Sequence, residues 1–291
     1  MTSFEKASAR AIRRKPRKDE IDVFGLTHIG NVRTENQDHF LVGSLHKRIE
    51  VIATSLSESQ LKPAVGDRLA FVMMVSDGVG GGVGGEEASR VTLEGVSQYL
   101  SQSMHCYYTA DPTDDHEFAK TLEEAAMRCH SELAERSDRL EEGRRATTLT
   151  LFLGVWPRAY ILQVGDSRYY LLRGTELTQV SRDQTMAQEL IDMGVFKRHE
   201  PAAEKWAHVL SSAIGGQQTT PVVTGIENDW GYVHLLCSDG LTKHVPDDRI
   251  RERLVAMTSA QQTCEALLQD ALDAGGTDNV TVIVGRTFRR D

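Results

Sequence analysis

Residues 69–78 read LAFVMMVSDG, an apolar run that ends in an Asp-Gly pair. A short apolar run bounded by turn residues is typical of a strand that is buried on both faces. The pattern returns in HLLCSDG at residues 234–240, and single acids lie beside other apolar runs, Asp166 in ILQVGDS and Asp278 in GGTDN. We therefore expect a buried β-structure in which several strands place an acid at one end.

The chain on both sides of this stretch alternates between groups of strands and pairs of helices. Apolar runs predict strands at residues 21–29, 38–43, 49–53, 69–78, 147–156, 158–166, 168–174, 176–180, 232–240 and 279–285. Apolar residues at helical spacing predict helices at residues 86–102, 114–139, 184–193, 201–208, 246–257 and 259–275. Because consecutive strands are joined by short turns, the sheets should be antiparallel, with the longer helices covering their faces.

The composition excludes several classes of function. The 291 residues are 40% hydrophobic and 26% charged, with a formal net charge of −9. This charge disfavours a nucleic-acid binder, which needs a basic face. The four cysteines lie far apart, which argues against a disulfide framework or a structural zinc site. The sequence shows neither an apolar run of membrane-spanning length nor a secretory signal, so we expect a cytoplasmic protein without a membrane span.

The first 19 residues differ from the rest of the chain, since they are rich in Lys and Arg and poor in apolar residues. Such a segment is typical of a solvated tail. We therefore expect a flexible basic arm over residues 1–19 and a single domain over residues 20–291. Little in the sequence bears on assembly, and we expect a monomer.

Asp77, Asp166, Asp239 and Asp278 form the most informative pattern, joined by Asp38 in VRTENQDHF. Any one Asp-Gly pair is typical of a turn. Several carboxylates that meet at strand ends would repel each other, and hard cations between them relieve the repulsion. Oxygen ligands without Cys or His at zinc-like spacing favour Mg²⁺ or Mn²⁺ over Zn²⁺.

The ordered motifs GNVRTENQDHF, VSDGVGG, ATTLTLFLGV, VGDSRYYLLRG, SRDQT, LLCSDGLT and GGTDNVTVIV resemble those of the metal-dependent protein phosphatases, the type-2C serine/threonine class in its bacterial branch. The resemblance runs from about residue 22 to 287. It implies an α+β fold, a four-layer α-β-β-α sandwich of two antiparallel β-sheets flanked by helices. It also implies a phosphatase that uses two divalent cations, Mn²⁺ or Mg²⁺, with a third, weaker one in bacterial relatives.

The resemblance assigns metal ligands by position in this sequence. Asp77 would bridge two cations, and the carbonyl of Gly78 would bind one of them. Asp239 and Asp278 would complete the other. Asp166 would hold the third cation together with Asp239.

Further positions match the residues that bind substrate and water. Arg33 would bind the substrate phosphate, for which a planar guanidinium is suited. Asp38 would orient metal-bound water, and Gln37 and Asn279 would support the site from behind the ligands. Gln37 stands where many members have glutamate, and Val79 stands where some have a histidine after the Asp-Gly pair.

The implied reaction is hydrolysis of phosphoserine and phosphothreonine in proteins, by attack of a metal-bridging water and without a phosphoenzyme. Its partners would be phosphorylated proteins and a cognate serine/threonine kinase in a bacterial signalling pathway. Because Gln37 removes one negative charge, a non-catalytic binding or regulatory module of the same fold is the alternative. Residues 184–225 correspond to the flap beside the active site, where Met193, Phe196 and Trp206 either shape a substrate groove or pack on the domain.

Overall fold

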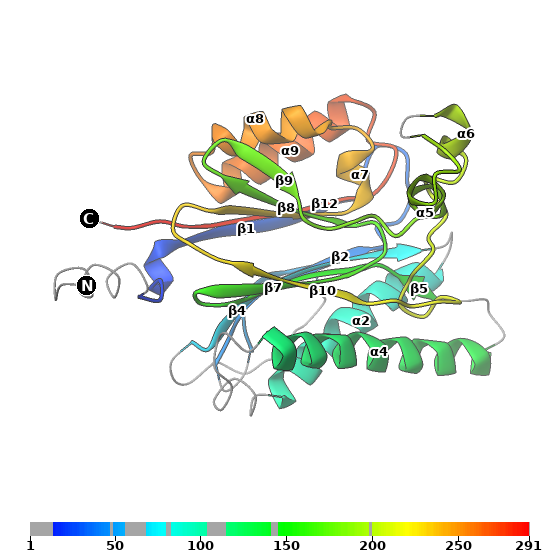
Figure 1. Cartoon of the computed structure of the whole chain (residues 1–291), viewed down its shortest axis with the longest axis horizontal. Helices are drawn as coiled ribbons and strands as arrows, with labels where there is room; N and C mark the ends of the chain where they lie inside the picture. The colour runs from blue at the N-terminus through cyan, green and yellow to red at the C-terminus, as the bar shows by residue number, and fades with distance from the viewer. Residues whose placement is uncertain are drawn as a thin grey trace.

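Two antiparallel β-sheets lie face to face, and helices cover both outer faces (Figure 1). The computed structural model describes residues 14–46, 49–55, 68–79, 83–103, 115–140, 145–197 and 200–290. The arrangement confirms the expected α+β sandwich of four layers, α-β-β-α.

The larger sheet has seven strands, in the order β10-β7-β6-β4-β2-β3 with β5 paired to β4. Its strands are β2 (Asp38–Leu45), β3 (Ile49–Thr54), β4 (Ala70–Val79), β5 (Ala146–Thr147), β6 (Leu149–Val155), β7 (Arg158–Val164) and β10 (Val222–Glu227). The smaller sheet has five strands, in the order β1-β12-β11-β8-β9. Its strands are β1 (Ile21–His28), β8 (Arg168–Arg173), β9 (Glu176–Gln179), β11 (Val233–Cys237) and β12 (Val280–Thr287).

Strand β4 shows why the sequences of the central strands are continuously apolar. Met73 and Val75 point between the two sheets, where they pack in one buried cluster with residues of both. Val72 and Met74 point to the other face, into a cluster beneath α2 (Val83–Gln102). Successive side chains of a strand point to opposite faces, so burial of both faces requires apolar residues at every position.

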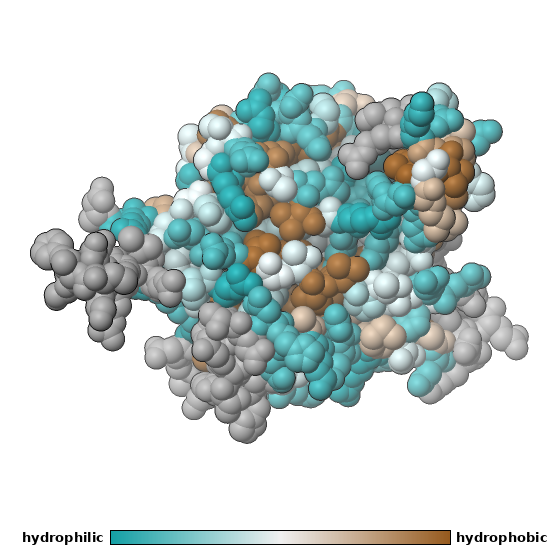
Figure 2. Space-filling view, in the orientation of Figure 1, coloured by the Kyte–Doolittle hydropathy of each residue, from teal (hydrophilic) through white to brown (hydrophobic). Residues whose placement is uncertain are grey.

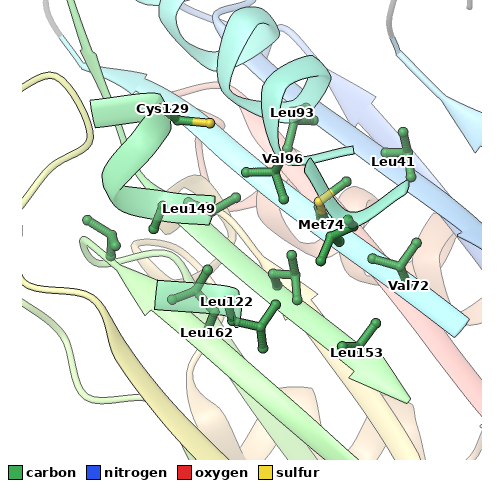
Figure 3. Packing of buried hydrophobic residues seen from close by; sticks show 14 of the residues in the cluster. Leu41, Val72, Met74, Leu93, Val96, Leu122, Cys129, Leu149, Leu153 and Leu162 are labelled. Atoms are coloured by element: carbon green, nitrogen blue, oxygen red, sulfur yellow. The ribbon is translucent and has the colours of Figure 1, made fainter. Parts of the chain in front are cut away.

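Helix α4 (Asp115–Leu140) completes the outer layer on the larger sheet. Figure 3 shows the core between these helices and the sheet, with side chains from both helices meeting those of the strands. The labelled residues are Leu41, Val72, Met74, Leu93, Val96, Leu122, Cys129, Leu149, Leu153 and Leu162.

The opposite outer layer consists of α7 (Asp239–Thr242), α8 (Asp247–Val255) and α9 (Ala260–Asp273). Val282 and Val284 of β12 pack under this layer, whereas Ile283 between them points into the space between the sheets. The smaller sheet is thus also buried on both faces.

The flap, defined here as residues 184–225, extends from one end of the sandwich and carries α5 (Met186–Asp192) and α6 (Pro201–Glu204) (Figure 1). Figure 2 shows apolar side chains gathered on the surface over these helices, and Met193 is 73% and Trp206 is 44% exposed. For these two residues the structure therefore favours exposure over packing on the domain.

Two expectations about the flap are wrong in detail. The helix expected at 201–208 ends at Glu204, because Trp206 and Val209 make i→i−3 backbone bonds that tighten the chain into turns. The strand β10 was not expected. Among the described residues it pairs with β7 alone, and its short apolar run is interrupted by Thr224 and Gly225.

The structure bears on three further expectations, about the basic arm, the cysteines and membrane spans. Residues 1–13 of the expected arm lie outside the described part of the chain, and Arg14 donates to Glu20 at 2.6 Å within the part described. Cys129, Cys237 and Cys264 are buried free thiols, and Cys106 is not described. Among the described residues, none of the helices has the length and apolar character needed to cross a membrane.

His234 is a buried histidine on β11, only 4% exposed, with its ring centroid 4.7 Å from that of Phe152 and tilted by 47° to it. Its Nε2 lies 3.2 Å from Oδ1 of Asn228, which can only accept, and its Nδ1 lies 2.8 Å from the hydroxyl of Tyr169. These contacts fit a neutral ring protonated at Nε2 that accepts from the tyrosine. Burial lowers the pKa of His234 to about 3.

We predict that His234 makes the protein acid-sensitive. The unfolded chain takes up a proton on this ring below its ordinary pKa of about 6.5, while the folded protein does not until about pH 3. Stability is therefore full above pH 6.5 and falls as the pH drops, by up to about 1.4 kcal/mol per pH unit for this one group. Urea unfolding between pH 7.5 and 5 should show a loss about 2 kcal/mol larger in wild type than in His234→Gln. Equal pH slopes in the two proteins would contradict the prediction.

Candidate metal and phosphate site

Asp38 and Asp77 lie directly opposite each other on the neighbouring strands β2 and β4. Directly opposed side chains of an antiparallel pair point to the same face, with Cβ atoms about 4.5–5.5 Å apart. The backbone of Asp77 is fixed by Thr148, which donates its amide to the Asp77 carbonyl at 2.9 Å and accepts from the Asp77 amide at 3.0 Å. The register of the sheet therefore places two carboxyl groups side by side.

Asp38 is the deeper of the two acids, at 2% exposed. Its Oδ2 accepts hydrogen bonds from the hydroxyls of Ser238 and Thr281, both at 2.7 Å. Its buried Oδ1 has no hydrogen-bond partner among the described residues. Burial raises the pKa of Asp38 to about 6, even though the two hydroxyls act to lower it.

Asp239 begins α7, and Asp278 lies just before β12. The ammonium of Lys243 lies between them, 2.6 Å from Oδ2 of Asp239 and 2.7 Å from Oδ2 of Asp278. Nε of Arg33 lies 2.8 Å from Oδ1 of Asp278. In the described part of the chain no three His, Cys, Asp or Glu side chains converge as a ready-made metal site. At this pair the carboxylates instead hold cationic side chains.

A cavity of about 220 Å³ joins these groups at the end of the sandwich. Its lining residues are Arg33, Gln37, Asp77, Gly78, Val79, Thr148, Asp166, His208, Leu210, Asp239, Lys243, Asp278 and Asn279. It thus brings together every residue that the sequence singled out for the site except Asp38, which lies behind Asp77. Their individual roles remain predictions.

Several carboxyl groups lie close to Asp77 at the cavity, and burial together with these groups raises its pKa. Loss of solvent and then the neighbouring carboxyls, Asp38 first among them, raise the pKa of Asp77 well above its ordinary value. Burial, followed by the charges of Asp239 and Asp183, raises the pKa of Asp166 to about 8. Ionising both Asp77 and Asp166 is therefore unfavourable unless a cation lies nearby.

Asp278 behaves differently because it has cationic partners. Burial acts to raise its pKa, but the hydrogen bonds from Lys243 and Arg33 outweigh burial and leave the pKa below its ordinary value. The same bond raises the pKa of Arg33. Arg33 is thereby held at the mouth of the cavity, with its side chain 50% exposed.

The glycines of the two Asp-Gly pairs are required by close packing. A Cβ on Gly78 would lie 2.3 Å from the carbonyl oxygen of Gly85, and one on Gly240 would lie 1.9 Å from that of Asn279. Neither glycine has a positive φ. The pairs in VSDG and CSDG therefore mark places where another backbone segment touches the chain, and they do not mark turns.

Asn279 fixes the loop that carries Arg33 and Gln37. Its Nδ2 donates to the carbonyls of Ile29 and Glu35, both at 2.9 Å, and its Oδ1 accepts from the amide of Gln37 at 2.9 Å. The side chain is 6% exposed. Asn279 immediately precedes β12, and its contacts position this loop over the cavity.

Lys243 and His208 line the cavity but were not predicted. Lys243 follows Asp239 by four residues in SDGLTK, a spacing that places the two side chains on one side of a helical turn and could have been read. His208 belongs to the flap, and no local pattern indicates that it reaches the acids. A second groove of about 340 Å³ runs under the flap and shares Asp166, His208, Asp239 and Lys243 with the cavity.

Known proteins of similar sequence are bacterial phosphatases. The serine/threonine protein phosphatase PstP of Mycobacterium tuberculosis is 32% identical over 217 residues, which are 74% of this chain and 40% of that protein. The chain thus spans less than half the length of that relative. The serine/threonine phosphatase stp of Listeria monocytogenes is 26% identical over 215 residues, 73% of this chain and 83% of that protein.

Solved structures agree over nearly the whole chain. The crystal structure of the M. tuberculosis phosphatase PstP/Ppp has a TM-score of 0.72 at 27% identity and covers 92% of this chain and 99% of that one. The catalytic domain of PstP in complex with two manganese ions has a TM-score of 0.68 at 29% identity, with 92% and 99% covered.

The sequence model for protein phosphatase 2C matches residues 61–275, the part of the chain that contains Asp77, Asp166 and Asp239. The match extends over most of the sandwich and agrees with the ordered motifs and with the solved structures. This chain therefore belongs to the protein phosphatase 2C family.

Proposed function

We propose that this chain is a metal-dependent protein phosphatase that hydrolyses phosphoserine and phosphothreonine. The observation that carries the proposal is the opposed pair Asp38 and Asp77, in which Oδ1 of Asp38 is buried without a hydrogen-bond partner among the described residues. A cation held by Asp77 would relieve the repulsion, and a water bound to that cation could donate to the free oxygen of Asp38. The relatives named above are serine/threonine phosphatases, which supports the assignment.

The donor set fits hard divalent cations. The acids that line the cavity, Asp77, Asp166, Asp239 and Asp278, offer only oxygen, which suits Mn²⁺ or Mg²⁺. We infer that Asp77, the Gly78 carbonyl, Asp239 and Asp278 would hold two such cations, and that Asp166 would take part in a third, weaker site. When bound, such cations supply Lewis acidity and a water of lowered pKa as the nucleophile.

The chain's own residues bind and orient the substrate. Arg33 presents a planar guanidinium at the cavity mouth, where it can bind two oxygens of a phosphate. Asp38, fixed by two hydroxyls, has one oxygen free to orient water. Neither the Ser238 hydroxyl nor that of Thr281 is available as a nucleophile, because both residues are fully buried and cannot reach a substrate phosphate. This arrangement supports direct hydrolysis without a phosphoenzyme.

Phosphorylated proteins are the proposed partners, with a serine/threonine kinase acting in opposition. The flap borders the cavity through His208 and Leu210, Arg33 is half exposed there, and Met193 and Trp206 are exposed elsewhere on the flap. A protein surface can reach such an open site, which a small enclosed pocket would not allow.

We predict that Asp38→Asn stabilises the metal-free protein. The amide oxygen still accepts from Ser238 and Thr281, while one buried negative charge is removed beside Asp77. In EDTA the melting temperature should rise by about 2–4 °C, equivalent to about 1 kcal/mol. The further rise caused by Mn²⁺ should be smaller than in wild type. Thermal unfolding measures both shifts, with Asp248→Asn on the exposed start of α8 as the control. A less stable apo variant with an undiminished Mn²⁺ shift would refute the role assigned to Asp38.

Hydrolysis of a phosphothreonine peptide should require both the divalent cation and Asp239. We expect Mn²⁺ to support the reaction, EDTA to abolish it, and Asp239→Asn to lower kcat/KM by more than about 100-fold, the upper end of the loss seen for residues that only support a ligand. Asp248→Asn should keep full activity. A folded wild type that is silent at every metal concentration would mean that the fold serves as a binding module.

Arg33→Ala should lower kcat/KM by about 10²–10³-fold, the usual cost of losing one donor that stabilises developing charge. Arg33→Lys should recover only part of the loss, because an ammonium binds phosphate as a point charge. Mn²⁺ binding, measured by calorimetry, should be retained, since Arg33 contacts Asp278 but is not itself a proposed metal ligand. If lysine restored full activity, planar recognition of the phosphate would be excluded.

A further inference from the structure

Lys243 occupies the place between two carboxylates that the proposed function assigns to a divalent cation. Its Nζ lies 2.6 Å from Asp239 and 2.7 Å from Asp278. The three side chains are about equally shielded, at 23%, 19% and 17% exposed for Lys243, Asp239 and Asp278. Hydrogen bonds between ionised groups are stronger than neutral ones. The ammonium therefore forms strong salt bridges with both Asp239 and Asp278.

The position of the ammonium follows from the local fold. Lys243 is the residue that ends α7, and its amide donates to the Asp239 carbonyl at 2.8 Å. This single helical turn places residues 239 and 243 on the same side. The helical turn that positions the proposed metal ligand Asp239 thus also places the ammonium of Lys243 beside it.

We propose that Lys243 is an internal competitor for the cation at Asp239 and Asp278, and that metal binding displaces its ammonium into the groove under the flap. The inference rests on the proposed metal site. Without metal the ammonium offsets one of the two negative charges of the pair and, together with Arg33 on Asp278, keeps the pair assembled. With metal the two positive charges cannot share the same carboxylate oxygens, because like charges at such distances repel.

The groove under the flap can receive the displaced side chain. Lys243 lines both this groove and the cavity, so its side chain borders the space into which the ammonium would move. The flap residues Glu200 and Glu204 also line the groove. The ammonium therefore leaves one acidic pair for a place that other acids border.

A purely structural role for Lys243, in which its ammonium holds the two acids in place for the cation, predicts the opposite effect on metal binding. If Lys243 stayed on Asp239 and Asp278 and held them in place for the cation, its removal would weaken metal binding. If it competes, its removal strengthens binding. The sign of the change in Mn²⁺ affinity separates the two roles.

The first experiment measures Mn²⁺ binding by calorimetry and by the electron paramagnetic resonance signal of free Mn²⁺. Lys243→Met keeps the length of the side chain without its charge, and Lys205→Met removes an exposed lysine of the flap as the matched control. We expect Lys243→Met to bind Mn²⁺ at least ten-fold more tightly than wild type, a difference of about 1.4 kcal/mol. The control should match wild type. Equal or weaker binding in Lys243→Met overturns the proposal.

A second experiment uses the wild-type protein and decides the matter if Lys243→Met does not fold. Amine-reactive labelling, read by mass spectrometry, is compared in EDTA and at saturating Mn²⁺. Release of the ammonium predicts that labelling of Lys243 rises at least three-fold with Mn²⁺, while Lys205 stays constant. Unchanged or lower labelling of Lys243 overturns the inference.

The outcomes also separate this inference from the proposed function. If wild type binds Mn²⁺ and Lys243→Met binds it no better, the metal site stands and the competition fails. If neither protein binds Mn²⁺, both proposals fail together.

Discussion

Asp38 belongs to one sheet and is held by the other, and the site depends on this contact. The residue lies on β2 of the larger sheet, yet the hydroxyls that bind its Oδ2 come from Ser238, after β11, and Thr281, in β12. A carboxylate buried between two sheets is unstable unless it is hydrogen-bonded. The contact therefore fixes how the ends of the sheets meet, and with them the distance between Asp77 on one side and Asp239 and Asp278 on the other.

The apolar packing serves the same geometry. Met73 and Val75 fill the space between the sheets while Val72 and Met74 pack under α2, so β4 cannot shift by one residue without exchanging its two faces. Register is thereby fixed at the strand that ends in Asp77. The absence of room for a Cβ at Gly78 shows how closely the neighbouring segment approaches there.

Much of the fold could be predicted from sequence because its central strands are buried on both faces and give continuous apolar runs. The motifs also indicated which acids meet. Strand β10 gave no such signal, since its short apolar run is interrupted by Thr224 and Gly225, and α6 is too short for a periodic pattern. His208 could not be placed, because its approach to the acids depends on how the flap folds back. Lys243 was visible in SDGLTK, but its bond to Asp278 joins residues 35 apart and is a tertiary contact.

The link from Asp38 to Ser238 and Thr281 also has a mechanical consequence. A ligand that binds Asp77 on the larger sheet and Asp239 on the smaller one would bridge the sandwich at the same end where Asp38 already joins it. At the far end, near the start of β1 and the end of β12, the sheets are held by packing and by contacts such as that of His234 with Phe152 on β6 (Figure 1). Occupancy of the cavity would therefore link the two sheets at one end of the molecule. Under force or in partial unfolding, the sheets would separate first at the opposite end.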